Sequence, residues 1–209
     1  MIKIIIVDDH PVLRRGLKQI LLEEPDMDVV GEAENAQEAF KIIHTTDCDV
    51  VILDISLPGA SGVEILKQLK YEYMKLPVLI LSMHPEEQYA LRVMKAGASG
   101  YLKKDSAPEE LVKAIRKIIS GGKYVSSSLA EILIADMETS DRPLHEKLSD
   151  REFQIMRMIA SGKAIKTIAE ELCLSEKTVS TYRTRLLEKM HMNANAEIIG
   201  YALNNKLFD

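Results

Sequence analysis

Five short apolar runs in the first half of the chain restrict the folds available to it. Because these runs are nearly continuous in Ile, Val and Leu rather than alternating with polar residues, they are typical of parallel strands buried on both faces. Between them, apolar residues return at three- and four-residue steps, which indicates helices. The pattern predicts strands alternating with five helices in one doubly wound α/β domain over residues 1–120. The runs are Ile2–Val7, Val29–Ala33, Val50–Leu53, Val78–Leu81 and Gly100–Leu102.

The pattern changes after Gly121 and Gly122. Apolar residues between 129 and 137 predict a short helix, and ETSDRP (138–143) reads as a polar tether. From 148 onward the strand pattern is absent and four helices are predicted, with Ser149 and Glu152 in the spacing of a capping box and Ser175 as a further cap. We therefore expect a linker over 121–147 and a small all-α four-helix domain over 148–209. The predicted helices are 150–161, 165–172, 176–190 and 194–204.

The lengths of the apolar runs and the spacing of the cysteines disfavour several classes of protein. No apolar run reaches the roughly 18–20 residues that a membrane span requires, and the first run is too short for a signal peptide. Cys48 and Cys173 lie far apart without metal-ligand spacing, so we expect reduced thiols. The sequence predicts a cytoplasmic protein without a membrane partner.

Polar residues follow the predicted strands at their carboxyl ends. Asp8 and Asp9 follow the first run, Asp54 the third, Ser82 the fourth, and Lys104 lies just past the fifth. With strand order 2-1-3-4-5 the carboxylates converge, and charges ~4 Å apart repel by roughly 4 kcal/mol at an effective dielectric near 20. Each residue alone could be a turn former, a helix cap or a solvated side chain. Together they favour a cation site, and oxygen ligands suit Mg²⁺ better than zinc.

DDHP, LDISLPGASG, LSMH and GASGYLKKD resemble the flavodoxin-like receiver domain of two-component response regulators. The resemblance implies that Asp54 accepts a phosphoryl group from a histidine kinase. It assigns Mg²⁺ to Asp9 and Asp54, to Asp8 through water, and to the backbone carbonyl of Ser56. It also implies that Ser82 and Tyr101 form a conformational switch. Lys104 matches the pairing lysine of the family.

Two departures from the family pattern concern this site. Many receivers have Lys-Pro with a cis bond after the fifth strand, whereas here Asp105 follows Lys104. The sequence alone does not determine whether the Lys104–Asp105 peptide bond is cis or trans. Ser56 and His84 occupy the two positions that tend to tune dephosphorylation in the family. The resemblance implies a protein that is not an enzyme for other substrates, although it can catalyse its own phosphorylation and dephosphorylation.

The predicted helix from Glu176 is amphipathic. Val179, Leu186 and Met190 form one stripe, and residues 175–191 hold four Lys/Arg against two Glu. Charge alone would favour a solvated face in a protein-interaction bundle. However, L-S-x-R-E, I-A-E-x-L and L-S-x-K-T-V-S-T-Y-R resemble the LuxR-type helix-turn-helix of the NarL/FixJ subfamily. That resemblance implies that Ser180, Thr181 and Thr184 contact DNA bases. It implies mostly contacts to the DNA backbone for a second set of residues, which are Lys177, Tyr182, Arg183, Arg185 and Lys189.

The sequence thus predicts a transcriptional response regulator whose DNA binding is controlled by phosphorylation of Asp54. The resemblance implies a histidine kinase partner, a two-fold symmetric DNA site, and a homodimer when phosphorylated. The family suggests the first and fifth helices as the dimer surface. In this subfamily the receiver commonly masks the recognition helix until phosphorylation, and the 121–147 tether is long enough to permit a masked or an open arrangement.

Two other classes of protein share parts of this sequence pattern. A flavodoxin-like phosphohydrolase would require a second acid two residues after the nucleophile, where this chain has Ser56. A receiver with a protein-binding tail, or with phosphorylation-independent control, would keep the fold but bind DNA independently of Asp54.

Overall fold

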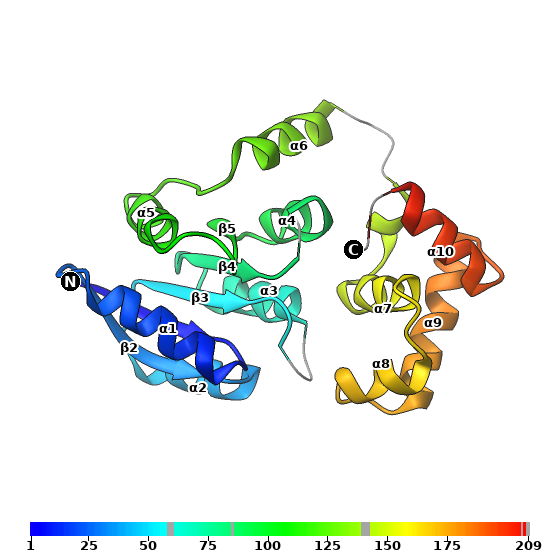
Figure 1. Ribbon diagram of the computed structural model, residues 1–209, viewed down its shortest axis with the longest axis horizontal. Helices are drawn as coiled ribbons and strands as arrows, with labels where there is room; N and C mark the ends of the chain where they lie inside the picture. The colour runs from blue at the N-terminus through cyan, green and yellow to red at the C-terminus, as the bar shows by residue number, and fades with distance from the viewer. Residues whose placement is uncertain (58–60, 85, 139–142, 206, 208–209) are drawn as a thin grey trace. The chain divides into compact units, whose positions relative to one another are not determined.

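The computed structural model describes residues 1–57, 61–84, 86–138, 143–205 and 207 (Figure 1). The chain forms two compact units, Met1–Ala130 and Glu131–Asp209. Residues 139–142 of the predicted tether lie outside the described residues, as do Pro58, Gly59 and Ala60 of the LDISLPGASG motif. Among the described helices, none has the length and apolar character needed to cross a membrane.

The first unit contains a parallel five-stranded sheet in the order β2-β1-β3-β4-β5, which confirms the predicted order. Each predicted apolar run lies within one strand. Since Val7 pairs with Leu53 in a parallel register, the residues that follow β1 and the end of β3 meet at the same edge of the sheet. The strands are β1 (Ile2–Val7), β2 (Met27–Ala33), β3 (Val50–Asp54), β4 (Val78–Ser82) and β5 (Gly100–Lys103).

Helices cover both faces of this sheet (Figure 1). Ile4 and Ile6 belong to a buried cluster with Leu17 of α1 and Ile115 of α5. Ile5 points to the opposite face, which α2, α3 and α4 cover. The burial of β1, β3 and β4 on both faces explains their continuous apolar sequences. The helices are α1 (Pro11–Leu22), α2 (Ala36–Thr45), α3 (Gly62–Glu72), α4 (Glu86–Lys95) and α5 (Pro108–Ile119).

Among the described residues after α5, the regular elements are all helices. α6 (Ser127–Glu138) corresponds to the predicted short helix, and a 3₁₀ helix, η1 (Leu144–Lys147), was not predicted. The Ser149 capping box is present: Ser149 N–H donates to Glu152 Oε2 at 2.7 Å and Ser149 Oγ accepts from Glu152 N–H at 3.3 Å. Ser175 Oγ accepts from Thr178 N–H at 3.0 Å, which confirms the predicted cap. The α-helices described after η1 are α7 (Asp150–Ala160), α8 (Ile165–Glu171), α9 (Glu176–Met190) and α10 (Asn195–Asn204).

Candidate functional site

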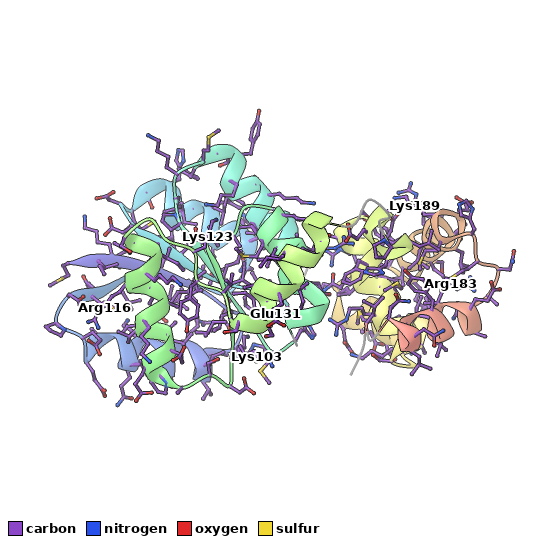
Figure 2. The ribbon with its side chains drawn as sticks, turned by 90° about the horizontal axis from the view of Figure 1, so that it is seen from above. Lys103, Arg116, Lys123, Glu131, Arg183 and Lys189 are labelled. Carbon is purple, nitrogen blue, oxygen red and sulfur yellow. The ribbon has the colours of Figure 1, made fainter. Side chains whose placement is uncertain are left out.

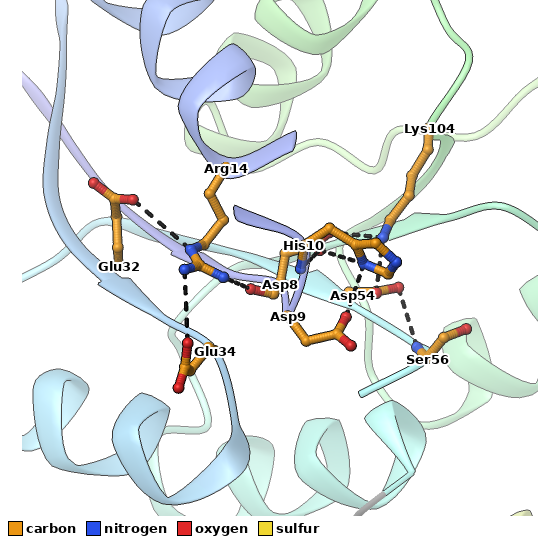
Figure 3. A network of polar contacts seen from close by, with 9 residues as sticks. All are labelled: Asp8, Asp9, His10, Arg14, Glu32, Glu34, Asp54, Ser56 and Lys104. Carbon is orange, nitrogen blue, oxygen red and sulfur yellow. Dashed lines mark hydrogen bonds and ion pairs between the residues drawn. The ribbon is translucent and has the colours of Figure 1, made fainter. Parts of the chain in front are cut away.

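Three carboxylates meet where β1 and β3 end (Figure 3). Asp8, Asp9 and Asp54 each offer an oxygen, and His10 a ring nitrogen, all within 4.8 Å of one another. Asp8 is 2% exposed and Asp54 1% exposed. The neighbouring strands place these groups together, as the sequence predicts, and like charges at this separation require a nearby positive charge.

Lys104 supplies that positive charge. Its Nζ lies 2.7 Å from Asp8 Oδ2 and 2.8 Å from Asp54 Oδ2, and its side chain is 4% exposed. The Lys104 N–H donates to the Ser82 carbonyl at 2.8 Å, which fixes the backbone just past β5. The Lys104–Asp105 peptide bond is trans, which answers the question that the sequence left open.

The buried pocket shifts the protonation equilibria of this pair. Burial raises the pKa of Asp54 above its usual range; Lys104 opposes this shift and Asp8 reinforces it. For Lys104, burial lowers the pKa, but Asp54 and Asp8 together outweigh burial and hold the pKa of the ammonium above its usual value. The lysine therefore stays charged between the two carboxylates at neutral pH.

Ser56 and His84 lie beside the carboxylates. Ser56 N–H donates to Asp54 Oδ1 at 3.0 Å, and Ser56 Oγ lies 3.3 Å from His84 Nε2. The first contact fixes the backbone that carries the Ser56 carbonyl, the predicted metal ligand. The second brings together the two positions that the resemblance associates with dephosphorylation.

Ser82 and Tyr101 both bind the backbone of His84. Ser82 Oγ accepts from His84 N–H at 3.0 Å, and Tyr101 OH donates to the His84 carbonyl at 2.7 Å. Ser82 is fully buried and Tyr101 is 1% exposed, so the tyrosine side chain points inward in this structure. The two predicted switch residues are thus joined through one peptide segment between β4 and α4.

Two residues near the carboxylates were missed in the sequence. His10 was interpreted only as the start of a helix, yet its Nδ1 lies 3.0 Å from Asp8 Oδ1 and 2.8 Å from Asp9 Oδ1. Arg14, one helical turn later, donates from Nη1 to the Asp8 carbonyl. The adjacency of His10 to two aspartates was a usable signal, whereas nothing in the sequence marked Arg14.

The carboxylate oxygens fit a divalent cation. Asp8 Oδ2 and Asp9 Oδ1 are buried and accept no hydrogen bond of good geometry among the described residues. Lys104 Nζ and His10 Nδ1 lie at ion-pair distance from them but leave lone pairs available. Hard oxygen donors at the edge of a sheet are the ligands that Mg²⁺ prefers.

The second candidate surface is α9, which the turn at Cys173 joins to α8. Val179, Leu186 and Met190 are buried, as the amphipathic pattern predicts. The opposite face exposes six of the predicted DNA-contacting residues, while Tyr182 and Arg183 are half-buried. The exposed six are Lys177, Ser180, Thr181, Thr184, Arg185 and Lys189.

Four of these predicted contacts already have partners within the protein. Arg183 Nε donates to Asn195 Oδ1 at 2.6 Å, and Lys189 Nζ lies 2.7 Å from Glu152 Oε2 (Figure 2 labels Arg183 and Lys189). These two side chains therefore also join α9 to α10 and to the cap of α7. Two hydroxyls donate to carbonyls one turn earlier in α9, and both remain able to accept: Thr181 to Lys177 at 2.9 Å, and Thr184 to Ser180 at 3.1 Å.

Comparison with known proteins matches both units. Residues 4–116 match the model of the response regulator receiver domain, and residues 146–202 that of bacterial regulatory proteins of the luxR family. Response regulator UvrY of Escherichia coli K12 is 37% identical over 210 residues, which cover 99% of this chain and 96% of that protein.

Solved structures of RcsB are similar over nearly the whole chain. RcsB of Salmonella enterica serovar Typhimurium, bound to promoter rprA in the presence of phosphomimetic BeF3-, is 25% identical, with a TM-score of 0.66 and coverage of 96% of this chain and 97% of that one. A structure of two RcsB dimers bound to two parallel DNAs is 26% identical, with a TM-score of 0.61 and coverage of 98% of both chains.

Proposed function

The chain belongs to the NarL/FixJ response regulators, which join a receiver domain to a LuxR-type helix-turn-helix, and on this premise we propose that phosphorylation of Asp54 controls its DNA binding. It is a DNA-binding transcription regulator. The observation that carries the proposal is the buried ion pair in which Lys104 bridges Asp54 and Asp8. We further propose a receiver over 1–120, a linker over 121–147 and a DNA-binding domain over 148–209.

In the proposed reaction an oxygen of Asp54 attacks the phosphorus of a phosphohistidine on the kinase. The P–N bond breaks, and its electron pair leaves with the imidazole nitrogen. Lys104 holds Asp54 oriented before the reaction and pairs with a phosphoryl oxygen afterwards. The same groups would support self-phosphorylation from small phosphodonors and self-catalysed hydrolysis, without activity on other substrates.

The metal in this proposal is Mg²⁺. Asp9, Asp54 and the backbone carbonyl of Ser56 would hold it directly, and Asp8 through water. When bound, it would neutralise negative charge on the phosphoryl oxygens. The buried oxygens of Asp8 and Asp9 without hydrogen bonds support this assignment.

The switch would act through Ser82 and Tyr101. After phosphorylation, Ser82 Oγ would donate to a phosphoryl oxygen and shift inward, which would vacate space beside His84. That shift would favour the inward Tyr101, which already binds the His84 carbonyl. The phosphoryl group thereby biases a two-state repacking.

The output is DNA recognition by α9. We propose that Ser180, Thr181 and Thr184 face the DNA bases. The DNA backbone would be bound by Tyr182 and by the basic residues Lys177, Arg183, Arg185 and Lys189. The phosphorylated form would pair as a homodimer on a two-fold symmetric site, with α1 and α5 as the dimer surface, in the cytoplasm. The RcsB dimers bound to DNA support, by similarity, DNA binding as a dimer.

The test combines phosphorylation with DNA binding in the full-length protein. Acetyl phosphate with Mg²⁺ should add one phosphoryl group and tighten binding to a site selected from random DNA. Asp54→Asn should lose both effects, and Asp28→Asn, on β2, should keep both. Phosphorylation that survives Asp54→Asn would refute the assignment of the acceptor, and DNA affinity insensitive to phosphorylation would refute the control.

A further inference from the structure

The chain beyond α5 returns to the sheet at its outer edge. Tyr124 pairs in parallel with Gly100, the first residue of β5. Tyr124 N–H donates to the Ser99 carbonyl at 3.0 Å, and its own carbonyl accepts from Tyr101 N–H at 3.1 Å. Because β5 is the last strand of the sheet, this segment satisfies part of an otherwise unpaired edge.

The side chains around Tyr124 hold the segment in place. Tyr124 OH donates to Glu110 Oε2 on α5, and Lys117 Nζ lies 5.8 Å from the centre of its ring. The preceding residue, Lys123 (labelled in Figure 2), donates from Nζ to the Ala98 carbonyl. Tyr124 also packs against the buried cluster beneath α1 and α5. The first residues of the linker are therefore fastened to the receiver by backbone and side-chain contacts.

Gly100 makes this close approach possible. A Cβ at this position would lie 2.8 Å from the Tyr124 carbonyl oxygen, 3.0 Å from Tyr124 Cβ and 3.1 Å from Ile118 Cδ1. The nearest of these atoms is backbone, which cannot move aside without separating the two segments. A larger residue at position 100 should therefore detach the linker while the rest of β5 can remain in the sheet.

Tyr101 connects this edge to the phosphoacceptor site. Its hydroxyl binds the His84 carbonyl beside the carboxylates, and its N–H binds the Tyr124 carbonyl at the start of the linker. We propose that Tyr124 is a positioning residue that couples the state of Tyr101 to the linker leading to the DNA-binding domain. This inference rests on the proposed control by Asp54, and it assigns the transmitting contact to the backbone pairing of residues 99–101 with Tyr124.

The test measures coupling rather than activity alone. For full-length wild-type protein and Tyr124→Ala, DNA affinity is measured with and without acetyl phosphate and Mg²⁺, and the ratio of the two affinities is taken. Allosteric coupling is typically about 5- to 150-fold. Because the tyrosine side chain holds the paired backbone against α5 and the buried cluster, Tyr124→Ala should release that backbone and bring the ratio close to 1, while Asp54 is phosphorylated to the wild-type extent. Tyr71→Ala, which removes an exposed tyrosine on α3, is the matched control and should keep the wild-type ratio.

Two further variants separate coupling from a loss of structure. Gly100→Ala should lower the ratio as Tyr124→Ala does, and should speed hydrogen exchange at the Tyr101 and Tyr124 amides but not in β1. Tyr124→Phe keeps the backbone pairing and the ring, so it should retain most of the ratio.

The possible outcomes are distinguishable. A wild-type ratio above 1 that persists in Tyr124→Ala or Gly100→Ala would overturn the coupling role alone. A ratio that falls only because phosphorylation of Asp54 falls would overturn it as well. A wild-type ratio of 1 would instead refute control by Asp54, and the coupling role with it.

Discussion

Replacing Lys104 with Met should destabilise the N-terminal unit far more than the same change at its neighbour Lys103. Lys104 Nζ lies 2.7 and 2.8 Å from two carboxylate oxygens, and none of the three side chains is more than 4% exposed. Lys103, by contrast, is exposed at the end of β5. Removing one partner of a buried ion pair costs about 3–5 kcal/mol, whereas surface changes usually stay within about 0.5 kcal/mol. We expect the free energy of unfolding to fall by about 3 kcal/mol for Lys104→Met and by about 0.5 kcal/mol or less for Lys103→Met.

The size of this loss should depend on pH, because the carboxylates that remain can take up a proton. Burial already raises the pKa of Asp54 above its usual value of 3.8, and loss of the lysine removes a contact that lowers it. A carboxyl group whose pKa is higher in the folded than in the unfolded state contributes fully to the stability of the folded protein below its unfolded-state pKa. That contribution is lost as the pH rises through its folded-state pKa. The deficit of Lys104→Met should therefore be small in acid and grow towards neutral pH. Adding Asp54→Asn to this variant should restore part of the loss at neutral pH.

Urea unfolding of the full-length variants, without Mg²⁺, at about pH 5 and about pH 7.5, measures these differences. Hydrogen exchange at the β1 amides reports unfolding of the N-terminal unit separately from the C-terminal helices. Equal losses of unfolding free energy for Lys103→Met and Lys104→Met would show that the ion pairs of Lys104 with the buried carboxylates do not stabilise the fold. A deficit that is the same at both pH values would refute the proposed repulsion between the remaining carboxylates.

The C-terminal unit supplies the other predictions. Arg157→Met should lower its free energy of unfolding by about 1.5–3 kcal/mol in thermal denaturation, because the buried guanidinium donates to the Leu207 carbonyl at 2.7 Å. Ser149→Ala should cost about 1 kcal/mol in the same assay through loss of the capping box, whereas Ser149→Asp should cost little. Thr181→Ala should change the preferred base sequence more than the overall affinity, and uniform weakening across a DNA library would contradict base contact. Lys177→Ala should weaken all DNA binding and reduce the slope of log affinity against log salt by about 0.9, so an unchanged slope would exclude a phosphate contact.

The sheet and the carboxylate cluster were predictable because both follow from local patterns. A buried parallel strand requires a continuous apolar sequence, and the strand order then determines which strand ends meet. Asp8 and Asp54 each follow an apolar run directly and Lys104 lies two residues past another, so their convergence required only the order of the strands. The caps at Ser149 and Ser175 were similarly visible, since a capping box lies within four consecutive residues.

Contacts between distant segments were not predictable in this way. Lys189 was read only as a DNA contact because its partner Glu152 lies 37 residues away and on another helix. The pairing of Tyr124 with Gly100 was missed because a single bridge leaves no repeating pattern in the sequence. The 3₁₀ helix at 144–147 is likewise too short for a period to be recognised.

The two proposed switch residues share a main-chain partner that every substitution except proline leaves in place. Ser82 and Tyr101 bind the main-chain N–H and carbonyl of position 84, while the imidazole at that position contacts Ser56. The side chain at position 84 can therefore change while the main-chain contacts of Ser82 and Tyr101 stay in place. Under the proposed mechanism, such a change would alter the lifetime of the phosphorylated state separately from the contacts that transmit it.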